Sequence, residues 1–218
     1  MLSHEQVMAK LKLAEVGAVI TNSHLVYTSG RHGSAYVDKD AIYPFVNVTA
    51  DLCQSLVDLA ARDDWARDAT VIIGPERGGI ILSQWTAYHL SQLTGNAVWA
   101  VYAEKTGDGQ DFLIKPRWLK HVQGKNALVV DDVLTTGGST RKVVKLVQTS
   151  GGLVQGVIAL CNRGRVTAKE LNVPKLCSLV EVNLDSWDEA DCPFCGDGVP
   201  INTQVGHGKE FLARQQSK

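Results

Sequence analysis

The chain has 218 residues, with 22 Lys and Arg against 23 Asp and Glu, which gives a net charge of −1. This length supports one substantial core, and no Pro-rich, Ser-rich or charged linker divides it, so we expect a single domain. The near-neutral charge argues against binding to long nucleic acid, and no run approaches the roughly 20 apolar residues that span a membrane. Five scattered cysteines fit reduced thiols, and the amino terminus lacks an apolar leader, so we expect a cytoplasmic protein.

The amino-terminal part begins with an expected helix and continues with a polar segment. Apolar residues at helical spacing predict a helix that stops near Gly17. Residues 25–40, LVYTSGRHGSAYVDKD, are rich in Gly, Ser, Tyr and charge. On composition this segment is either a hairpin at a sheet edge or a recognition segment, and both remain open.

A glycine-rich turn follows the first expected buried strand. Asn47 is expected to cap a helix that runs to about Arg62, and a strand covers residues 70–73. The turn GPERGG comes next, where glycines let a ligand approach the backbone and the Arg77 guanidinium suits phosphate oxygens. The alternative is a plain turn before the helix expected at 80–93.

A polar stretch, EKTGDGQDFLIKPRWLKHVQ at 104–123, follows the strand expected at 97–103. Its two glycines and its proline argue against a continuous helix. Such a stretch is often only a solvated surface, whereas a loop that closes over a site can supply cations and exclude water. The cations of this stretch are Lys105, Lys115, Arg117, Lys120 and His121.

The most informative stretch is ALVVDDVLTTGGST at 127–140. Residues 127–130 predict a buried parallel strand, which places Asp131 and Asp132 at its carboxyl end. Open α/β sheets bind ligands at that edge, and the acids offer acceptors for sugar hydroxyls or indirect ligands for a hydrated cation. The Thr-Thr-Gly-Gly-Ser run at 135–139 predicts a nest of backbone amides that favours a phosphate dianion.

Further strands are expected at 153–160 and 176–182. The alternation of strands and helices predicts a three-layer α/β core with a mainly parallel sheet and ligand loops at the carboxyl ends of its strands. Arg163 follows the first of these two strands, at the same edge. Such an arginine can also simply pair with an acid in solvent.

The tail contains a Cys-x-x-Cys pair, Cys192 and Cys195. A zinc site would need two further ligands, for which Cys177 and His207 are the conceivable candidates. A single pair of this spacing is a weak signal for metal and a weaker one for a redox dithiol, so the pair has no assigned role at this level.

Residues 127–139 resemble, without a gap, the 5-phosphoribosyl 1-pyrophosphate (PRPP) signature of type I phosphoribosyltransferases. The resemblance implies the three-layer type I fold over 1–218, with a core at 65–165 and a small hood built from 1–45 and the C-terminal segment. It implies that Asp131 and Asp132 hold the ribose hydroxyls. It further implies contacts to the 5-phosphate from Thr135, Thr136, Gly137, Gly138 and Ser139, and contacts to the pyrophosphate from Glu76, Arg77, Gly78 and Gly79.

Within that family the chain is most similar to orotate phosphoribosyltransferases, whose base-binding segment residues 28–38 resemble. Two positions depart from their pattern. Thr28 stands where these enzymes usually have a Lys or Arg that contacts PRPP. Either Arg31 or His32 makes this contact instead, or the contact is absent. Asn162 stands where Asp is usual. The resemblance implies substrate contacts from Ser29, Gly30, Tyr36, Thr135 and Arg163, the last of which would meet the carboxylate of the acceptor base.

The implied activity is transfer of the phosphoribosyl group of PRPP to orotate, which gives orotidine 5'-phosphate and pyrophosphate in de novo pyrimidine biosynthesis. Mg²⁺ is implied as cofactor, with no protein side chain as an expected direct ligand. Lys105 is implied to act in catalysis beside Asp131 and Asp132, and the loop 104–123 to be shared across a homodimer. The alternatives are a phosphoribosyltransferase for another base, such as a purine, and a non-catalytic regulator that senses PRPP.

Overall fold

The computed structural model describes residues 4–27, 29–182 and 186–216. The chain divides into two compact units, and each is described by itself. The larger unit consists of Met1–Lys12 and Tyr43–Val182, and the smaller of Leu13–Ile42 and Asn183–Lys218. In the described part of the chain, no helix is both long and apolar enough to cross a membrane.

A six-stranded sheet in the order β10-β9-β8-β5-β6-β7 forms the centre of the larger unit. Five of its strands run parallel, and β7 pairs antiparallel with β6 at the edge. All five residues of β5 are buried, as expected for a parallel strand that is covered on both faces. The strands are β5 Val71–Pro75, β6 Trp99–Lys105, β7 Phe112–Leu113, β8 Asn126–Leu134, β9 Leu153–Asn162 and β10 Leu176–Glu181.

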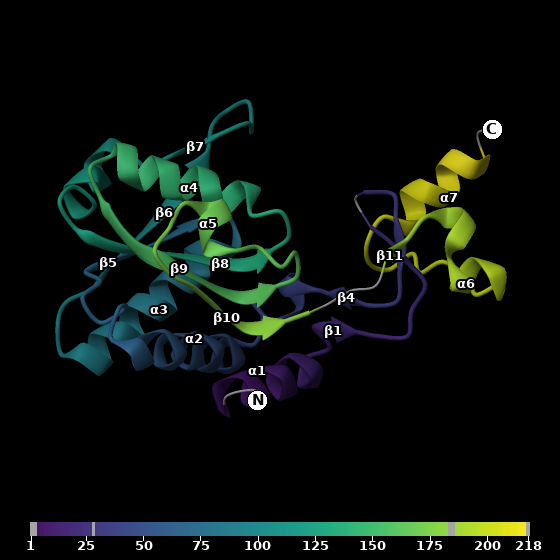
Figure 1. The fold of residues 1–218 in the computed structure, drawn as a ribbon, viewed down its shortest axis with the longest axis horizontal. Helices are drawn as coiled ribbons and strands as arrows, with labels where there is room; N and C mark the ends of the chain where they lie inside the picture. The colour runs from purple at the N-terminus through teal and green to yellow at the C-terminus, as the bar shows by residue number, and fades with distance from the viewer. Residues whose placement is uncertain (1–3, 28, 183–185, 217–218) are drawn as a thin grey trace. The chain divides into compact units, whose positions relative to one another are not determined.

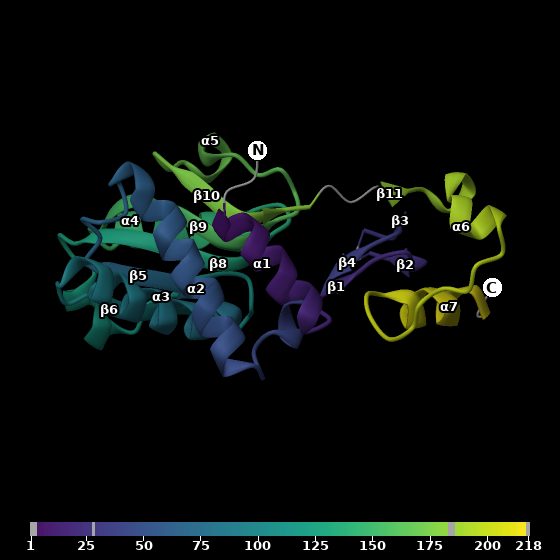
Figure 2. The same ribbon diagram turned by 90° about the horizontal axis from the view of Figure 1, so that it is seen from below.

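Helices cover both faces of this sheet. Figure 1 shows α4 and α5 on one face and α2 and α3 on the other, and Figure 2 looks onto the face that α2 covers. The three-layer α/β fold with a mainly parallel sheet, predicted from the alternation of elements, is thereby confirmed. The helices are α1 His4–Glu15, which begins in the larger unit and ends in the smaller, α2 Val46–Ala60, α3 Gly78–Thr94, α4 Gly138–Thr149 and α5 Ala168–Leu171.

Two details of the larger unit differ from the prediction. The strand β8 continues beyond residue 130 to Leu134, because it pairs with β9 as far as Leu134 opposite Asn162, so the two acids lie inside the strand. The helix α2 begins at Val46 with Phe45 as its N-cap, and no side chain caps it. The prediction that Asn47 caps this helix is therefore wrong.

The interpretation of 104–123 as one long loop is also wrong. Lys105 ends β6, residues 106–111 form the turn to β7, and a 3₁₀ helix spans Pro116–His121. Phe112, Ile114 and Val122 are buried in the hydrophobic core that α4 covers. Apolar side chains in this stretch therefore attach its second half to the sheet, and its longest exposed run is 107–111, in the turn to β7.

The smaller unit contains short antiparallel strands and two C-terminal helices. Its three-stranded sheet has the order β11-β3-β2, and β1 pairs with β4. Within 25–40, Leu25–Val26 pairs antiparallel with His32–Gly33, as the hairpin interpretation predicts. The elements are β1 Val19–Ile20, β2 Leu25–Val26, β3 His32–Gly33, β4 Tyr36–Val37, β11 Ser186–Trp187, α6 Pro193–Gly196 and α7 Gly208–Gln216, with 3₁₀ helices at Lys39–Ala41 and Glu189–Asp191.

Candidate active site

The candidate site lies at the carboxyl ends of the neighbouring strands β5 and β8. In the sheet, β6 lies on one side of β5 and β8 on the other. The chain therefore adds strands in one direction up to β7 and in the opposite direction from β8 onward, and the change of direction falls between β5 and β8. Ligands of open α/β sheets bind at such a switch point. The helices α3 and α4 begin directly after these strands, so two helix amino ends, which favour anions, lie at this edge.

The paired acids of β8 are buried and held by hydrogen bonds. Asp131 is 7% exposed and Asp132 6%. The hydroxyl of Thr140 donates to Oδ2 of Asp131, whose Oδ1 accepts from the Asp132 amide at 2.9 Å. Oδ2 of Asp132 accepts from the Tyr43 hydroxyl at 2.9 Å, and Oδ1 accepts from the Val133 amide at 2.7 Å. Backbone amides and two hydroxyls thus orient both carboxylates.

The loop between β8 and α4 has the geometry of an anion nest. Gly137, with φ of 68°, is the N-cap of α4, and no side chain caps this helix. A Cβ on Gly137 would lie 2.8 Å from a methyl of Leu171, so the position requires glycine on both counts. The amides of the first helical turn have no partner within the helix and are suited to phosphate oxygens, although the Gly138 amide also donates to the Thr136 hydroxyl at 3.4 Å.

The loop after β5 lies against the acid pair. A Cβ on Gly78 would lie 2.1 Å from Oδ2 of Asp132, and one on Gly74 would lie 2.6 Å from the Cα of Gly79. Arg77 is exposed where α3 begins, and the Glu76–Arg77 peptide bond is cis. The structure therefore brings Gly78 beside Asp132 of β8, and Gly79 packs against Gly74 at the end of β5.

Arg163 reaches the same edge from the loop after β9. Its Nη2 donates to the Thr135 hydroxyl at 3.3 Å, and its backbone amide donates to the Leu134 carbonyl at 2.9 Å. Asn162 is 7% exposed, and its side chain bonds the amide and the carbonyl of Val166 at 3.0 and 2.8 Å. The Asn at this position therefore shapes the turn that carries Arg163.

The cations of 104–123 separate into different environments. Lys115 pairs with Glu104 at 2.6 Å, and Arg117 lies over the Trp118 ring at 5.6 Å. His121 packs on Trp99, at the amino end of β6 and so at the edge opposite the acid pair. Lys105 ends β6 at the carboxyl edge, is exposed and has no ion pair with any residue that the structure describes.

The predicted base-binding residues Ser29, Gly30 and Tyr36 belong to the smaller unit, so their role remains a prediction. Thr28 lies outside the described residues. Both predicted substitutes for the missing cation have other roles within this unit. Arg31 pairs with Asp188 at 2.7 Å and also bonds Ser186, and His32 is fully buried. These contacts favour the alternative in which no cation replaces the Lys or Arg that is usual at position 28.

Tyr43 and Thr140 are site residues that sequence reasoning missed. Thr140 follows the Thr-Thr-Gly-Gly-Ser run directly, so a hydroxyl in the first turn of the helix behind the acids was a usable signal. Nothing in the sequence around Tyr43 indicates its contact with Asp132, because the two are 89 residues apart.

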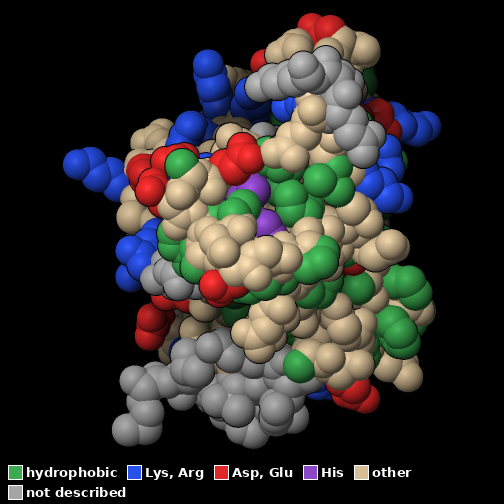
Figure 3. All heavy atoms as spheres, turned by 90° about the vertical axis from the view of Figure 1, so that its right-hand side faces the viewer, with side chains coloured by type: hydrophobic (Ala, Val, Ile, Leu, Met, Phe, Trp, Pro, Cys, Tyr) green, Lys and Arg blue, Asp and Glu red, His purple; other side chains and the backbone are tan. Residues whose placement is uncertain are grey.

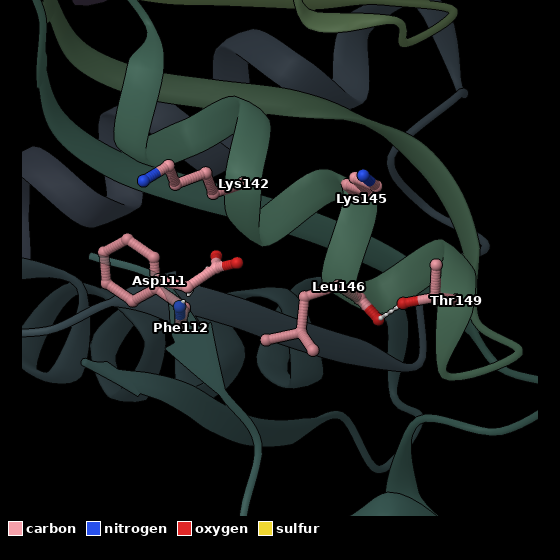
Figure 4. Close-up of a pocket in the computed structure, with 6 residues that line it drawn as sticks. All are labelled: Asp111, Phe112, Lys142, Lys145, Leu146 and Thr149. Carbon is pink, nitrogen blue, oxygen red and sulfur yellow. Dashed lines mark hydrogen bonds between the residues drawn. The ribbon is translucent and has the colours of Figure 1, made fainter. Parts of the chain in front are cut away.

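A pocket with a volume of about 280 Å³ lies elsewhere on the larger unit. Figure 4 shows it between α4 and the start of β7, with side chains from both. None of its lining residues belongs to the acid pair or to the glycine loops after β5 and β8. It is lined by Asp111, Phe112, Lys142, Lys145, Leu146 and Thr149.

Two buried acids beside two helix amino ends, at the switch point of a parallel sheet, form a site suited to a phosphorylated sugar. Residues 42–194 match the phosphoribosyl transferase domain, and the chain therefore belongs to the phosphoribosyltransferase family. It is 32% identical to an orotate phosphoribosyltransferase of Caldanaerobacter subterraneus subsp. tengcongensis, over 88% of this chain and 93% of that protein. It is 35% identical to that of Pelotomaculum thermopropionicum, over 85% and 90%. The crystal structure of the Aeropyrum pernix orotate phosphoribosyltransferase has a similar fold, with a TM-score of 0.60 and 24% identity over 80% of this chain and 94% of that one.

Proposed function

We propose that this protein is an orotate phosphoribosyltransferase. In the proposed reaction N1 of orotate, which gives up its proton to solvent, attacks C1 of PRPP, the bond from C1 to the pyrophosphate oxygen breaks, and orotidine 5'-phosphate and pyrophosphate form. The observation that carries this proposal is the contact between the two halves of the site, where Gly78 abuts the carboxylate of Asp132. The identity to orotate phosphoribosyltransferases over most of the chain supports orotate as the acceptor.

The donor is proposed to bind across both loops. Asp131 and Asp132 accept hydrogen bonds from the ribose hydroxyls, and residues 135–139 hold the 5-phosphate at the start of α4. Residues 76–79 face the pyrophosphate, where the amino end of α3 and Arg77 supply positive charge. These groups position the reacting atoms and stabilise the charge that develops on the leaving group.

Magnesium is proposed as the cofactor, because the donor set fits it. The two carboxylates of the acid pair lie beside the hydroxyls of Thr140 and Tyr43, so this part of the site is rich in oxygen atoms. Such oxygen-rich surroundings suit a hard cation that retains its own waters. Magnesium, when bound with PRPP, neutralises charge on the departing pyrophosphate.

Lys105, the last residue of β6, is the proposed catalytic cation. It lies at the carboxyl edge, whereas Lys115 and Arg117 contact Glu104 and Trp118. Residues 107–111, in the turn that follows Lys105, are exposed, so this turn is the part of the stretch suited to cover bound substrate and exclude water.

Arg163 is proposed to bind the carboxylate of orotate. Its contact with Thr135 supports this role, because a permanent cation lies beside the loop at 135–139, where the 5-phosphate is proposed to bind. Arg163→Gln is expected to raise KM for orotate about tenfold or more and to raise KM for PRPP much less. Equal effects on both substrates would reject this role.

A homodimer is proposed as the assembled form, with the turn 106–111 as the part of 104–123 that reaches the neighbouring subunit. Ile81, Trp85 and Tyr88 share one face of α3, and Ile81 and Tyr88 are 37% and 54% exposed. Light scattering of Tyr88→Glu should give the mass of a monomer, whereas Leu153→Glu, at another exposed apolar position, should remain dimeric.

A cytoplasmic location is proposed as well. None of the five cysteines, all of which the structure describes, forms a disulfide, which suits a reducing compartment.

The experiment that tests the function measures orotate-dependent release of pyrophosphate from PRPP with Mg²⁺. We expect turnover in the wild type and a loss of about a hundredfold or more in Asp132→Asn, with an unchanged circular dichroism spectrum. Wild-type turnover in Asp132→Asn would reject the assigned roles, and no turnover in the wild type would reject the activity.

A further inference from the structure

Four side chains of the smaller unit converge on one point, and none of them belongs to the proposed active site. They are His24, His32, Cys192 and Cys195, and their nearest ligand atoms all lie within 4.8 Å of one another. His24, His32 and Cys192 are at most 3% exposed, and Cys195 is half-buried. Buried imidazoles and thiols gathered in this way are typical of structural metal sites.

The distances in this cluster fit a tetrahedral metal site. Sγ of Cys192 and Sγ of Cys195 each lie 3.6 Å from Nε2 of His24, and Sγ of Cys195 lies 3.4 Å from Nδ1 of His32. A tetrahedral zinc ion with bonds of about 2.3 Å to sulfur and about 2.0 Å to nitrogen separates the two kinds of atom by about 3.5 Å. The two histidine nitrogens are 2.8 Å apart and would separate by about 0.5 Å around the ion.

The surroundings of His24 orient its ring as a ligand. Nδ1 of His24 lies 2.7 Å from the carbonyl oxygen of Val199, which can only accept, so Nδ1 carries the proton. Nε2 of a neutral ring then presents its lone pair to the cluster. A backbone carbonyl bonded to the distal nitrogen is the usual arrangement around a metal-bound histidine. Phe194 stacks on the same ring at 5.6 Å.

The local fold delivers the four ligands from two distant parts of the chain. His24 directly precedes β2, and His32 lies in β3, which pairs with both β2 and β11. Cys192 is the N-cap of α6 and Cys195 lies in its single turn, so this short helix points both sulfurs to one side. Figure 3 shows the surface on the side where Figure 1 labels α6 and α7, and the cluster lies beneath the surface, since His24 and His32 are only 2% and 0% exposed.

The cluster corrects the ligand set considered from sequence. Cys177 lies in β10 of the larger unit, and His207 faces Glu210 at 4.0 Å. Neither belongs to the cluster, and the two histidines of the β2–β3 hairpin take their places. The sequence offered no signal for this, because His24 and Cys192 are 168 residues apart.

We propose that His24, His32, Cys192 and Cys195 bind one Zn²⁺ ion. Two thiolates and two imidazoles in a tetrahedral arrangement match the preference of zinc. All four positions are filled by protein, so the ion has no open position for a substrate, and its role is structural. It links the amino-terminal hairpin, which carries Ser29 and Gly30, to the C-terminal segment.

A structural ion suits a unit of this size. Its buried hydrophobic residues are few compared with those of the larger unit, and small units with little core often depend on a metal for stability. The buried hydrophobic residues of the smaller unit are Leu13, Ala18, Leu25, Val26, Val37, Ile42 and Cys192. Removal of the ion is therefore expected to unfold this unit before the sheet of the larger one.

The metal content of the full-length protein, purified without chelator, tests the site. Mass spectrometry of the metals should find about one zinc per chain in the wild type and in Cys177→Ser, and a loss of zinc in Cys195→Ser. The Cys177→Ser control removes a thiol outside the cluster. Retention of zinc in Cys195→Ser, or equal loss in both variants, would overturn the proposal.

A second measurement on the wild type does not depend on the folding of a variant. After zinc is removed with a chelator, Co²⁺ should restore the melting temperature and give the intense visible bands of a tetrahedral thiolate site. Failure of the metal-free protein to take up Co²⁺ or Zn²⁺ would overturn the proposal. Isolation of a metal-free protein with a Cys192–Cys195 disulfide would also overturn it, in favour of a redox pair.

Discussion

The hydroxyl of Tyr43 donates a hydrogen bond of 2.9 Å to Oδ2 of Asp132. Tyr43 lies just before α2 and Asp132 lies in β8, so this bond joins the covering helical layer to the acid pair. A hydrogen bond to a charged group contributes roughly 1.5–3 kcal/mol, and Tyr43→Phe should therefore lower kcat/KM for PRPP about tenfold or more. Tyr102→Phe, which changes a tyrosine packed on Trp118, is the matched control and should stay within about twofold of wild type. Equal values for both variants would contradict the role of Tyr43.

The close approach of Gly78 to Asp132 leads to a second prediction. A methyl group in Gly78→Ala would lie 2.1 Å from the carboxylate and 2.2 Å from the Tyr43 hydroxyl, so these groups must move. We expect the Kd for PRPP, measured by calorimetry, to rise at least about tenfold. Gly196→Ala in α6 is the control, because a Cβ there meets nothing within 4 Å and the position lies outside the proposed PRPP site. PRPP binding that is unchanged in Gly78→Ala would show that the two loops do not form one site.

Lys105 and Lys120 provide a matched pair within 104–123. Lys105 ends β6 at the carboxyl edge, whereas Lys120 precedes His121, which packs against Trp99 at the opposite edge. Removal of one group that stabilises transition-state charge costs about a hundredfold or more in kcat, so we expect that loss in Lys105→Ala. Steady-state kinetics should find Lys120→Ala close to wild type. A larger loss in Lys120→Ala would assign the catalytic cation to the other lysine.

The buried thiols lead to a prediction about the reactivity of the cysteines. Burial raises the pKa of Cys53, Cys161 and Cys177 to about 12, so at pH 8 they remain protonated in the folded protein. Because the thiolate is the reactive form, these three cysteines should not react with a thiol reagent at pH 8 until the protein is unfolded. Mass spectrometry of the modified chain counts them. Rapid labelling of Cys161 in the native protein would contradict its burial beside Arg163.

The sequence predicted the fold through elements whose local pattern and tertiary role agree. The apolar runs before Gly74 and Asp131 are β-branched and short, and they became the buried strands β5 and β8. The anion nest at 135–139 was also predictable, because glycine and small hydroxyl residues have direct consequences for the backbone. The end of β8 was not predictable in this way, because pairing with β9, rather than local propensity, extends the strand to Leu134.

The rest of the site depends on contacts between residues that are far apart in the chain. Tyr43 reaches Asp132, and His24 meets Cys195, only because the sheet and the hairpin are in place. The stretch 104–123 was misread because its charged residues outnumber its apolar ones. Phe112, Ile114 and Val122 nevertheless supply enough buried surface to attach it to the core.

Pyrophosphate release from PRPP and Mg²⁺, compared among orotate, adenine, guanine, hypoxanthine and uracil, tests the central claim most directly. A site that meets an acceptor carboxylate with Arg163 should favour orotate over uracil, which lacks the carboxylate, by about a hundredfold or more in kcat/KM. It should give no sustained turnover with the purines. Turnover with a purine that exceeds turnover with orotate, or none with any base, would contradict the proposed function.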